Sequence, residues 1–203
     1  MSKKYIVAGI GTDVGKTVIS AILVEKLQAD YWKPIQAGDL ENSDTKKIQS
    51  LTSIPNHFFH PETYQLQTPM SPHAAAEIDS IRVDLDNFKL PETSNNLIVE
   101  LAGGLMVPLN ETDLVIDLVE KLNLPVILIS RYYLGSINHT LLSVEALQSR
   151  NIPIKGIIFN GEAVQSTKEI ILSRTELELL GEIPTITRID NEAVQQLTTE
   201  IHI

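Results

Sequence analysis

Residues 9–17 read Gly-Ile-Gly-Thr-Asp-Val-Gly-Lys-Thr, directly after the short apolar run Tyr5 to Ala8. A phosphate-binding P-loop has the pattern Gly, any four residues, then Gly-Lys-Thr or Gly-Lys-Ser. Here the first glycine lies one residue too early, so the stretch is a variant with five intervening residues. Backbone N–H groups at the start of a helix attract phosphate, and Gly15 lets the backbone approach it closely. The stretch therefore predicts a phosphate site rather than a plain glycine turn, with Lys16 near the phosphates and the Thr17 hydroxyl available to Mg2+.

Strands and helices alternate outward from this loop. Residues 17–28 carry apolar side chains at three- and four-residue steps, as on one face of a helix. Further strands are expected at residues 31–35, 97–101, 125–129 and 154–159, and further helices after a cap at Thr112 and at residues 137–148 and 168–180. The central strands are almost wholly apolar, which is typical of strands buried on both faces. This order predicts a three-layer α/β fold of the P-loop NTPase kind with a mostly parallel central sheet, in which ligands bind at the carboxyl ends of the strands.

The composition fits one globular domain that spans residues 1–203. The formal net charge of -10 leaves no basic footprint for DNA or RNA. The sequence contains no cysteine, which excludes disulfides, thiolate metal sites and cysteine nucleophiles. No stretch approaches the roughly 20 apolar residues of a membrane-spanning helix, and the first apolar run is too short for a signal peptide. We therefore expect a cytoplasmic protein with no nucleic-acid or membrane partner.

Polar residues follow several of the expected strands. Lys33 follows the second strand, and polar loop residues beside a phosphate site are enriched for function. Asp44 lies in the stretch Asn42-Ser43-Asp44 and can either begin a helix or give Mg2+ a second oxygen ligand. Glu100 ends an otherwise apolar strand, where a carboxylate is costly to bury unless it is paired or metal-bound. We therefore expect Glu100 at a metal site.

Two later strand ends carry weaker signals. Residues 134–139 open a helix whose free N–H groups favour a carboxylate, and His139 within them is expected to pack or cap rather than to catalyse. Asn160 follows the strand at residues 154–159, where its amide could read a nucleobase edge or simply make a turn.

Together these motifs resemble dethiobiotin synthetase, the penultimate enzyme of biotin synthesis, over nearly the whole chain. The matching landmarks are Gly9 to Val18, Lys33-Pro34 with Gly38, Asn42 to Asp44, Ser71 to His73 with Ala75, Glu100 with Ala102 to Gly104, Leu134-Gly135 with Ile137 to His139, Asn160, and Gly181 to Pro184. Each landmark alone is weak, but their order and spacing are specific.

The resemblance implies a role for each matching position. It implies Lys33 and Lys16 as catalytic residues, and Mg2+ held by Thr17, Asp44 and Glu100. The implied ATP-binding residues are Asp13, Val14, Gly15, Lys16, Thr17, Val18, Asp44, Glu100, Leu101, Ala102, Gly103, Asn160, Gly161, Pro184, Thr185 and Ile186. The implied substrate-binding residues are Thr12, Lys33, Ala37, Ser136, Ile137 and Asn138, with the loop around Ser136 at a homodimer interface.

The reaction that the resemblance implies joins 7,8-diaminononanoate and CO2 at the expense of ATP. One amine takes up CO2 as a carbamate, and the carbamate oxygen attacks the γ-phosphate to give a carbamic–phosphoric anhydride. The second amine then closes a cyclic urea, and dethiobiotin, ADP and phosphate leave. No protein nucleophile is needed, in agreement with the absence of cysteine.

Three positions depart from the family pattern. The family often has Thr-Asp where this chain has Ile10-Gly11, Ser or Thr at the position of Ala37, and Gly at the position of Leu101. Ala37 has no hydroxyl to offer the diamine, and Leu101 narrows the space beside the phosphates. These changes bear on substrate geometry more than on the class of reaction.

Three other functions compete with a synthetase. A P-loop ATPase switch would carry a lysine near position 11, where this chain has Gly11. A cobyrinate-type amidotransferase needs a glutaminase domain with a cysteine, which this chain lacks. A degenerate nucleotide-binding module stays open because of Ile10, Ala37 and Leu101, and ATP turnover that depends on the diamine would distinguish it from an enzyme.

Overall fold

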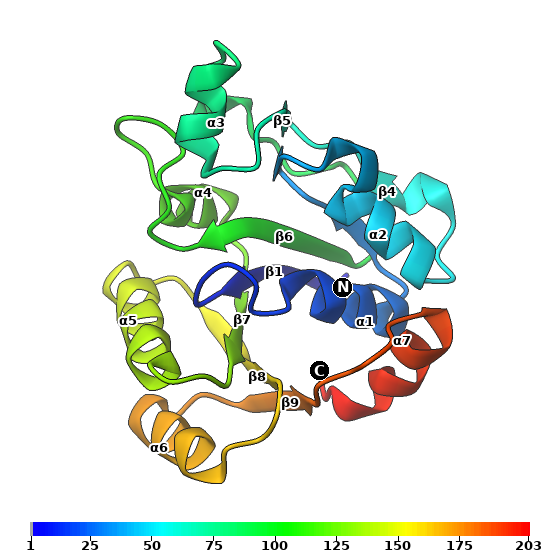
Figure 1. Cartoon of the computed structure of the whole chain (residues 1–203), viewed down its shortest axis with the longest axis vertical. Coiled ribbons are helices and arrows are strands. Elements are labelled where there is room, and N and C mark those ends of the chain that lie inside the picture. The colour runs from blue at the N-terminus through cyan, green and yellow to red at the C-terminus, as the bar shows by residue number, and fades with distance from the viewer. Residues whose placement is uncertain (1) are drawn as a thin grey trace.

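A seven-stranded sheet runs through the middle of the molecule, with the strand order β4-β2-β6-β1-β7-β8-β9 (Figure 1). The structure is a computed structural model that describes residues 2–203. The strands of this sheet are β1 (Lys4–Gly9), β2 (Asp30–Trp32), β4 (Phe59–His60), β6 (Leu97–Gly104), β7 (Val126–Arg131), β8 (Ile154–Asn160) and β9 (Leu179–Ile183). Each neighbouring pair runs parallel, which confirms the predicted parallel sheet.

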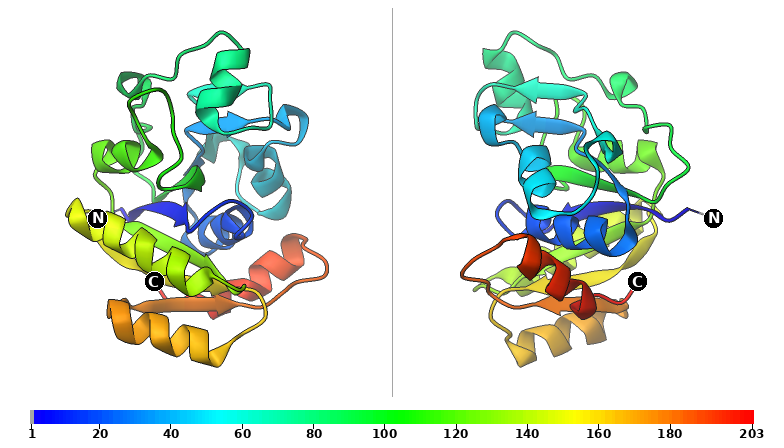
Figure 2. Two further views of the ribbon diagram at one scale, coloured as in Figure 1. Left: turned by 60° about the vertical axis from the view of Figure 1, so that its left-hand side comes forward. Right: turned by 90° about the vertical axis from the view of Figure 1, so that its right-hand side faces the viewer.

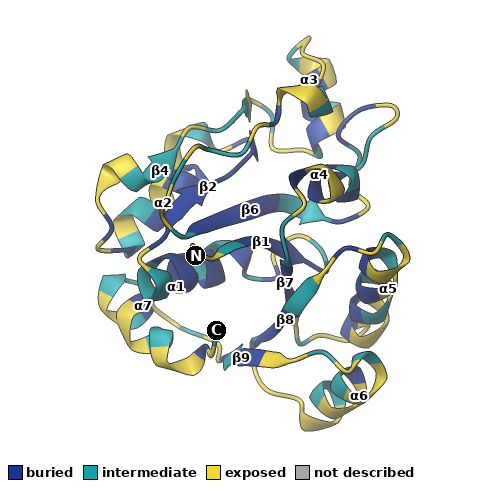
Figure 3. Ribbon diagram, turned by 180° about the vertical axis from the view of Figure 1, so that it is seen from behind, coloured by how far each residue is buried: buried dark blue, intermediate teal, exposed yellow. Residues whose placement is uncertain are grey.

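Helices cover both faces of this sheet, which confirms the three-layer α/β arrangement (Figure 1; Figure 3). One face carries α1 (Lys16–Leu27), α2 (Asp44–Leu51) and α7 (Asn191–Leu197), and the other carries α4 (Val115–Leu122), α5 (Ser136–Ser149) and α6 (Gln165–Thr175). Short 3-10 helices are η1 (Leu40–Asn42), η2 (Asn56–Phe58), η3 (Leu85–Asn87) and η4 (Thr198–Glu200). Among residues 2–203, every helix falls short of the length and apolar character needed to cross a membrane.

A small second sheet is added to this core. It pairs β3 (Ile35–Ala37) with β5 (Tyr64–Leu66) in parallel, and α3 (Pro72–Ile78) packs against both strands. Figure 2 shows this group stacked beyond β6, on the side away from β8 and β9. The small sheet therefore stands next to the strands β2 and β6, whose carboxyl ends carry the predicted polar residues.

The central strands form the core because both of their faces are covered. Residues 97–101 of β6 and residues 126–130 of β7 are all buried, and the same strands are dark in Figure 3. Burial on two faces leaves no place for an alternating polar pattern, as the sequence indicated. The one carboxylate within this part of β6, Glu100, therefore has to be satisfied by neighbouring side chains.

The predicted strand at residues 31–35 is two separate strands. β2 ends at Trp32 and β3 begins at Ile35, and the two strands belong to different sheets. Between them, Pro34 has no backbone N–H for a ladder, and the chain turns away from β6. This break places Lys33 at the carboxyl end of β2 rather than inside a strand.

Two helix boundaries were also predicted wrongly. The helix expected at residues 168–180 spans residues 165–175. It begins earlier than predicted, and it ends earlier because Glu176 adopts a left-handed conformation (φ 55°) and β9 begins at Leu179. Thr112 does not cap α4, since its backbone N–H donates to the side chain of Asn110 in the preceding turn. The helix begins at Val115, and Asp117 accepts a hydrogen bond from the backbone N–H of Leu114 at 2.6 Å.

Candidate active site

The loop between β1 and α1 is held from behind by the ends of two other strands. Gly15, the residue before α1, has φ +97°, and a Cβ added there would lie 2.1 Å from Nδ2 of Asn160. That amide donates to the carbonyl oxygen of Val14 at 2.8 Å, and Arg131 donates to the carbonyl oxygen of Asp13 at 2.9 Å. Only glycine suits this position, because it combines a left-handed conformation with no side chain. The loop therefore presents the start of α1 in one fixed conformation.

Lys16 is the first residue of α1 and bends back over the loop. Its ammonium donates to the carbonyl oxygen of Gly11 at 2.8 Å, and the residue is only 8% exposed. Burial lowers the pKa of Lys16 from 10.5 to about 8, although the nearby Glu100 carboxylate opposes this change. An anion bound at the loop would favour the charged form of this lysine.

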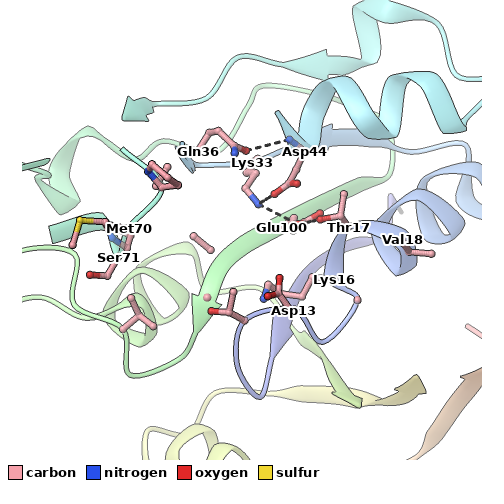
Figure 4. A pocket seen from close by; sticks show the side chains of 18 residues that line it. Asp13, Lys16, Thr17, Val18, Lys33, Gln36, Asp44, Met70, Ser71 and Glu100 are labelled. Atoms are coloured by element: carbon pink, nitrogen blue, oxygen red, sulfur yellow. Dashed lines mark hydrogen bonds and ion pairs between the residues drawn. The ribbon is translucent and has the colours of Figure 1, made fainter. Parts of the chain in front are cut away.

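A second lysine is buried between two carboxylates at the ends of β2 and β6. Lys33 contacts Asp44, the first residue of α2, and lies 3.1 Å from Oε1 of Glu100 (Figure 4). The hydroxyl of Thr17 donates to the same Oε1 at 2.8 Å. The hydroxyl of Tyr31 donates to Oε2 at 3.0 Å. Glu100, which is 1% exposed, is thus satisfied by neutral and charged donors together.

The electrostatics of this cluster favour the charged forms of Lys33 and Asp44. Burial disfavours a charged Lys33, but Glu100 and Asp44 outweigh burial and raise its pKa above the ordinary 10.5. Burial likewise opposes ionisation of Asp44, but Lys33 outweighs it and lowers the pKa of this carboxyl below 3.8. Burial, reinforced by Glu100, raises the pKa of Tyr31 well above 10.0, so this hydroxyl stays a donor.

All of these groups except Tyr31 open onto one cavity of about 670 Å3. Lys16 and Thr17 approach it from α1, Lys33 and Asp44 from the opposite wall, and Glu100 from its floor (Figure 4). The lining residues are Thr12, Asp13, Gly15, Lys16, Thr17, Val18, Lys33, Gln36, Ala37, Asp44, Pro69, Met70, Ser71, Pro72, Glu100, Ala102, Gly103 and Val107. The structure therefore brings together the predicted loop, both lysines and all three of the expected metal ligands.

Other predicted site residues lie outside this cavity. Leu101 is 2% exposed and packs in the hydrophobic core, on the other face of β6 from Glu100 and Ala102. Ser136 is 1% exposed at the start of α5, and Ile137 lines a separate, more apolar cavity of about 500 Å3. Of the predicted adenine contacts, Asn160 ends β8 and holds the back of the phosphate loop through Val14, and Gly161 follows it. Pro184, Thr185 and Ile186 follow β9 and do not line the main cavity. Asn138, beside Ile137, likewise does not line the main cavity, and the roles of all these residues stay predictions.

Several lining residues were missed from the sequence. Gln36 is 5% exposed and accepts from the backbone N–H of Asp44 at 3.2 Å, which links β3 to the start of α2. Residues 69–71, in the loop before α3, and Pro72, the first residue of that helix, close the cavity, although the sequence alone indicates no role for them. Tyr31, which bonds Glu100 without lining the cavity, was also missed, because an aromatic residue in a strand usually belongs to the core.

The site suits a hard divalent cation. The hydroxyl of Thr17 and the carboxylates of Asp44 and Glu100 lie together, and Mg2+ prefers such oxygen ligands. Residues 2–203 contain no group of three or more His, Cys, Asp or Glu side chains that could hold a metal. A hydroxyl and two carboxylates leave coordination positions for phosphate oxygens and water, as Mg2+ at a nucleotide requires.

The fold matches that of several solved structures. A ParA family ATPase from Chlorobium tepidum superposes with a TM-score of 0.55 at 10% identity, covering 98% of each chain. A MinC:MinD cell division protein complex from Aquifex aeolicus gives a TM-score of 0.52 at 13% identity, covering 96% of this chain and 86% of the other. At such low identity these likenesses show the fold alone, and they confirm the predicted three-layer α/β fold.

Sequence comparison is more specific. A family model described as an AAA domain matches residues 3–193. The ATP-dependent dethiobiotin synthetase BioD of Christiangramia forsetii is 55% identical over 192 residues, which cover 95% of this chain and 89% of that protein. The protein of the same name from Cytophaga hutchinsonii is 48% identical over 193 residues, which cover 95% of this chain and 93% of that protein. With the phosphate loop, the two lysines and the carboxylates in one cavity, the chain belongs to the ATP-dependent dethiobiotin synthetase family.

Proposed function

We propose that this protein uses ATP to convert 7,8-diaminononanoate and CO2 into dethiobiotin, ADP and phosphate. One structural observation carries the proposal: two buried lysines, Lys16 and Lys33, open onto the same cavity beside a phosphate-binding loop. The relatives that cover nearly the whole chain carry the name of this ATP-dependent synthetase. The competing ATPase switch would carry its second lysine near position 11, whereas here the second lysine is Lys33, on the wall where a second anion could meet the triphosphate.

The reaction proceeds through three bond-forming steps. One amine of the substrate attacks CO2 and loses a proton, which gives a carbamate. The carbamate oxygen attacks the γ-phosphorus of ATP, and the bond to ADP breaks. The second amine attacks the carbonyl carbon of the resulting anhydride, loses a proton and expels phosphate as the urea ring closes. The ring closure is intramolecular, so holding the amine against the anhydride supplies much of the rate.

The two lysines make the second step possible. Carbamate and triphosphate are both anions, and they repel each other unless positive charge lies between them. Lys33 keeps its charge because of Asp44 and Glu100, and Lys16 gains charge stability from any bound phosphate. Charges that are already in place before the reaction cost no reorganisation when the transition state forms.

We also propose Mg2+ as the metal cofactor, with Thr17, Asp44 and Glu100 as its protein ligands. When bound, this ion neutralises charge on the β- and γ-phosphates. The support is the set of oxygen donors that these three residues bring to the cavity. Lys33 contacts both carboxylates, so it holds them in place as well as supplying charge.

The residues proposed to contact the adenine and the substrate carboxylate lie outside the main cavity. We propose that Asn160, Gly161 and the residues 184–186 contact adenine. Asn160 bonds the phosphate loop at Val14, and the backbone N–H of Gly161 donates to the carbonyl oxygen of Ile183 at the end of β9, so the ends of these two strands lie together beside the loop. The loop before α5, with Ser136 to Asn138, is proposed to reach the substrate carboxylate from a second subunit of a homodimer. Exposed apolar residues next to this loop, Leu134 and Tyr133, support that arrangement, and sedimentation analysis of the protein tests it.

The proposed reaction is tested by identifying its product. The protein is incubated with Mg-ATP, 13C-labelled bicarbonate and 7,8-diaminononanoate, and the products are weighed by mass spectrometry. The expected product carries one labelled carbon and is lighter than the carbamate by one water. A labelled carbamate without any dehydrated product would contradict the ring closure.

A further inference from the structure

The two oxygens of Glu100 have different partners. Oε1 accepts from Thr17 at 2.8 Å and lies 3.1 Å from Lys33, both of which line the cavity. Oε2 accepts from the hydroxyl of Tyr31 at 3.0 Å, and Tyr31 is its one hydrogen-bond donor among residues 2–203. Tyr31 itself is fully buried and does not line the cavity. Whatever Tyr31 contributes to the reaction must therefore pass through Glu100.

The sheet places the tyrosine and the carboxylate on one face. Tyr31 of β2 pairs with Ile98 of β6, and Glu100 follows Ile98 by two residues along the strand. Side chains two residues apart in a strand point to the same face, so the tyrosine lies diagonally beside Glu100. Phe59 of β4 pairs with Tyr31 from the other side, and the two ring centroids lie 6.0 Å apart. The direction of the hydroxyl is thus determined by packing within the sheet.

We propose that Tyr31 is a positioning residue that fixes the orientation of the Glu100 carboxylate for the metal–nucleotide complex. By holding Oε2, the tyrosine directs Oε1 toward Thr17, Lys33 and the cavity. This inference rests on the proposed metal site and names a residue behind it. Groups that orient a metal ligand typically change metal affinity or activity by about 10- to 100-fold when they are removed.

The test is the variant Tyr31→Phe, which removes only the hydroxyl. Its matched control is Tyr5→Phe, because Tyr5 of β1 pairs with the same Ile98 from the opposite side. No hydrogen bond of the Tyr5 hydroxyl to another side chain or to the backbone is present within residues 2–203. Binding of Mn2+ in the presence of a non-hydrolysable ATP analogue is followed by the electron paramagnetic resonance signal of free Mn2+. We expect about 10-fold weaker Mn2+ binding for Tyr31→Phe and unchanged binding for the control.

A double-mutant cycle shows whether the effect passes through Glu100. In a Glu100→Gln background, Tyr31→Phe should cause little further loss of Mn2+ affinity. If Tyr31→Phe alone fails to fold, the two proteins in the Glu100→Gln background can still overturn the proposal, because a loss of Mn2+ affinity there cannot pass through the carboxylate. Unchanged Mn2+ binding in folded Tyr31→Phe would overturn the proposal. A full, independent loss from Tyr31→Phe in the Glu100→Gln background would overturn it equally.

Failure of the proposed reaction would look different. Phosphate release by the unaltered protein that ignores the diamine would remove the synthetase activity and leave the Mn2+ measurements intact. In steady-state assays, Tyr31→Phe should need about 10-fold more Mg2+ for half-maximal rate and recover much of its turnover at saturating Mg2+. A uniform loss of turnover at every Mg2+ concentration, without a change in this midpoint, would point to general loosening of the fold and would contradict positioning.

Discussion

Replacing Lys33 by alanine is the sharpest mutational test of the site. Lys33 is 4% exposed and contacts both Asp44 and Glu100, so alanine would leave two carboxylates side by side without their cation. The variant also removes a positive charge from the wall of the cavity where carbamate and triphosphate must meet. Two effects follow, one on stability and one on rate, and they can be measured separately.

The expected size of each effect comes from burial and charge. Removing one partner of a buried ion pair costs about 3–5 kcal/mol of folding free energy, and the lower end applies here because the Asp44 side chain is 21% exposed. Losing a charge donor that is already in place lowers the turnover number by about 10² or more. Mg-ATP should restore part of the stability, because the bound cation takes the place of the lost charge.

The assay measures both effects on the same preparation. Urea unfolding with and without Mg-ATP gives the stability, and phosphate release at saturating substrates gives the turnover number of the folded protein. Lys47→Ala is the matched control, since Lys47 lies 3.6 Å from the same Asp44 but is 46% exposed and outside the cavity. An exposed pair contributes only about 0.2–1 kcal/mol, so the control should keep its turnover number.

Two results would refute this reasoning. A near-normal turnover number in folded Lys33→Ala would end the assignment of Lys33 as a catalytic residue. An equal loss in Lys47→Ala would mean that the rate follows the total positive charge near Asp44, and that the buried position of Lys33 has no special role.

Two further predictions concern parts of the structure outside this ion pair. Gly15→Ala should weaken nucleotide binding, because the new methyl group collides with the amide of Asn160 and the left-handed conformation costs about 1–3 kcal/mol. Titration with an ATP analogue and urea unfolding check both effects, and unchanged binding would contradict the assignment of the loop. Asp117→Asn concerns pH: burial disfavours the charged carboxylate, but the backbone N–H of Leu114 and the side chain of Arg150 outweigh it and lower the pKa of Asp117 below 3.8. A depressed pKa stabilises the fold above the unfolded value and loses this contribution as the pH falls, so the unaltered protein should lose more stability than the variant between about pH 5 and pH 3. Parallel urea unfolding curves for both proteins across this range would contradict it.

The sequence predicts the sheet well because its strands are continuous apolar runs. Residues 97–101 and 126–129 lie in strands that are covered on both faces, and such apolar runs can be recognised without knowledge of the fold. The strand ends then locate polar residues at one edge of the sheet, since parallel strands share their direction. This is why Glu100 could be expected beside the phosphate loop in advance, whereas the catalytic role of Lys33 came from the family resemblance.

The wrongly predicted boundaries, at the end of α6 and between β2 and β3, lie in stretches whose local sequence fits more than one secondary structure. Leu177, Leu179 and Leu180 continue the apolar pattern of α6, so the period alone could not separate the helix from β9. Pro34 lies between two apolar stretches that the sequence does not separate. Only the structure shows that they are two strands, β2 and β3, in different sheets.

Contacts across strands could not be predicted from the sequence at all. Tyr31 meets Glu100 because β2 pairs with β6 in one register, and a shift by one residue would send the tyrosine to the other face. Gln36 supports Asp44 only because β3 lies against the start of α2. These residues therefore became visible as part of the site only in three dimensions.

Phosphate release from Mg-ATP and bicarbonate, with and without 7,8-diaminononanoate, tests the central claim most directly. We predict that release requires the diamine, because the carbamate oxygen is the group that takes up the γ-phosphate between Lys16 and Lys33. Release at the same rate without the diamine would contradict the claim, since the protein would then be an ATPase on a synthetase fold.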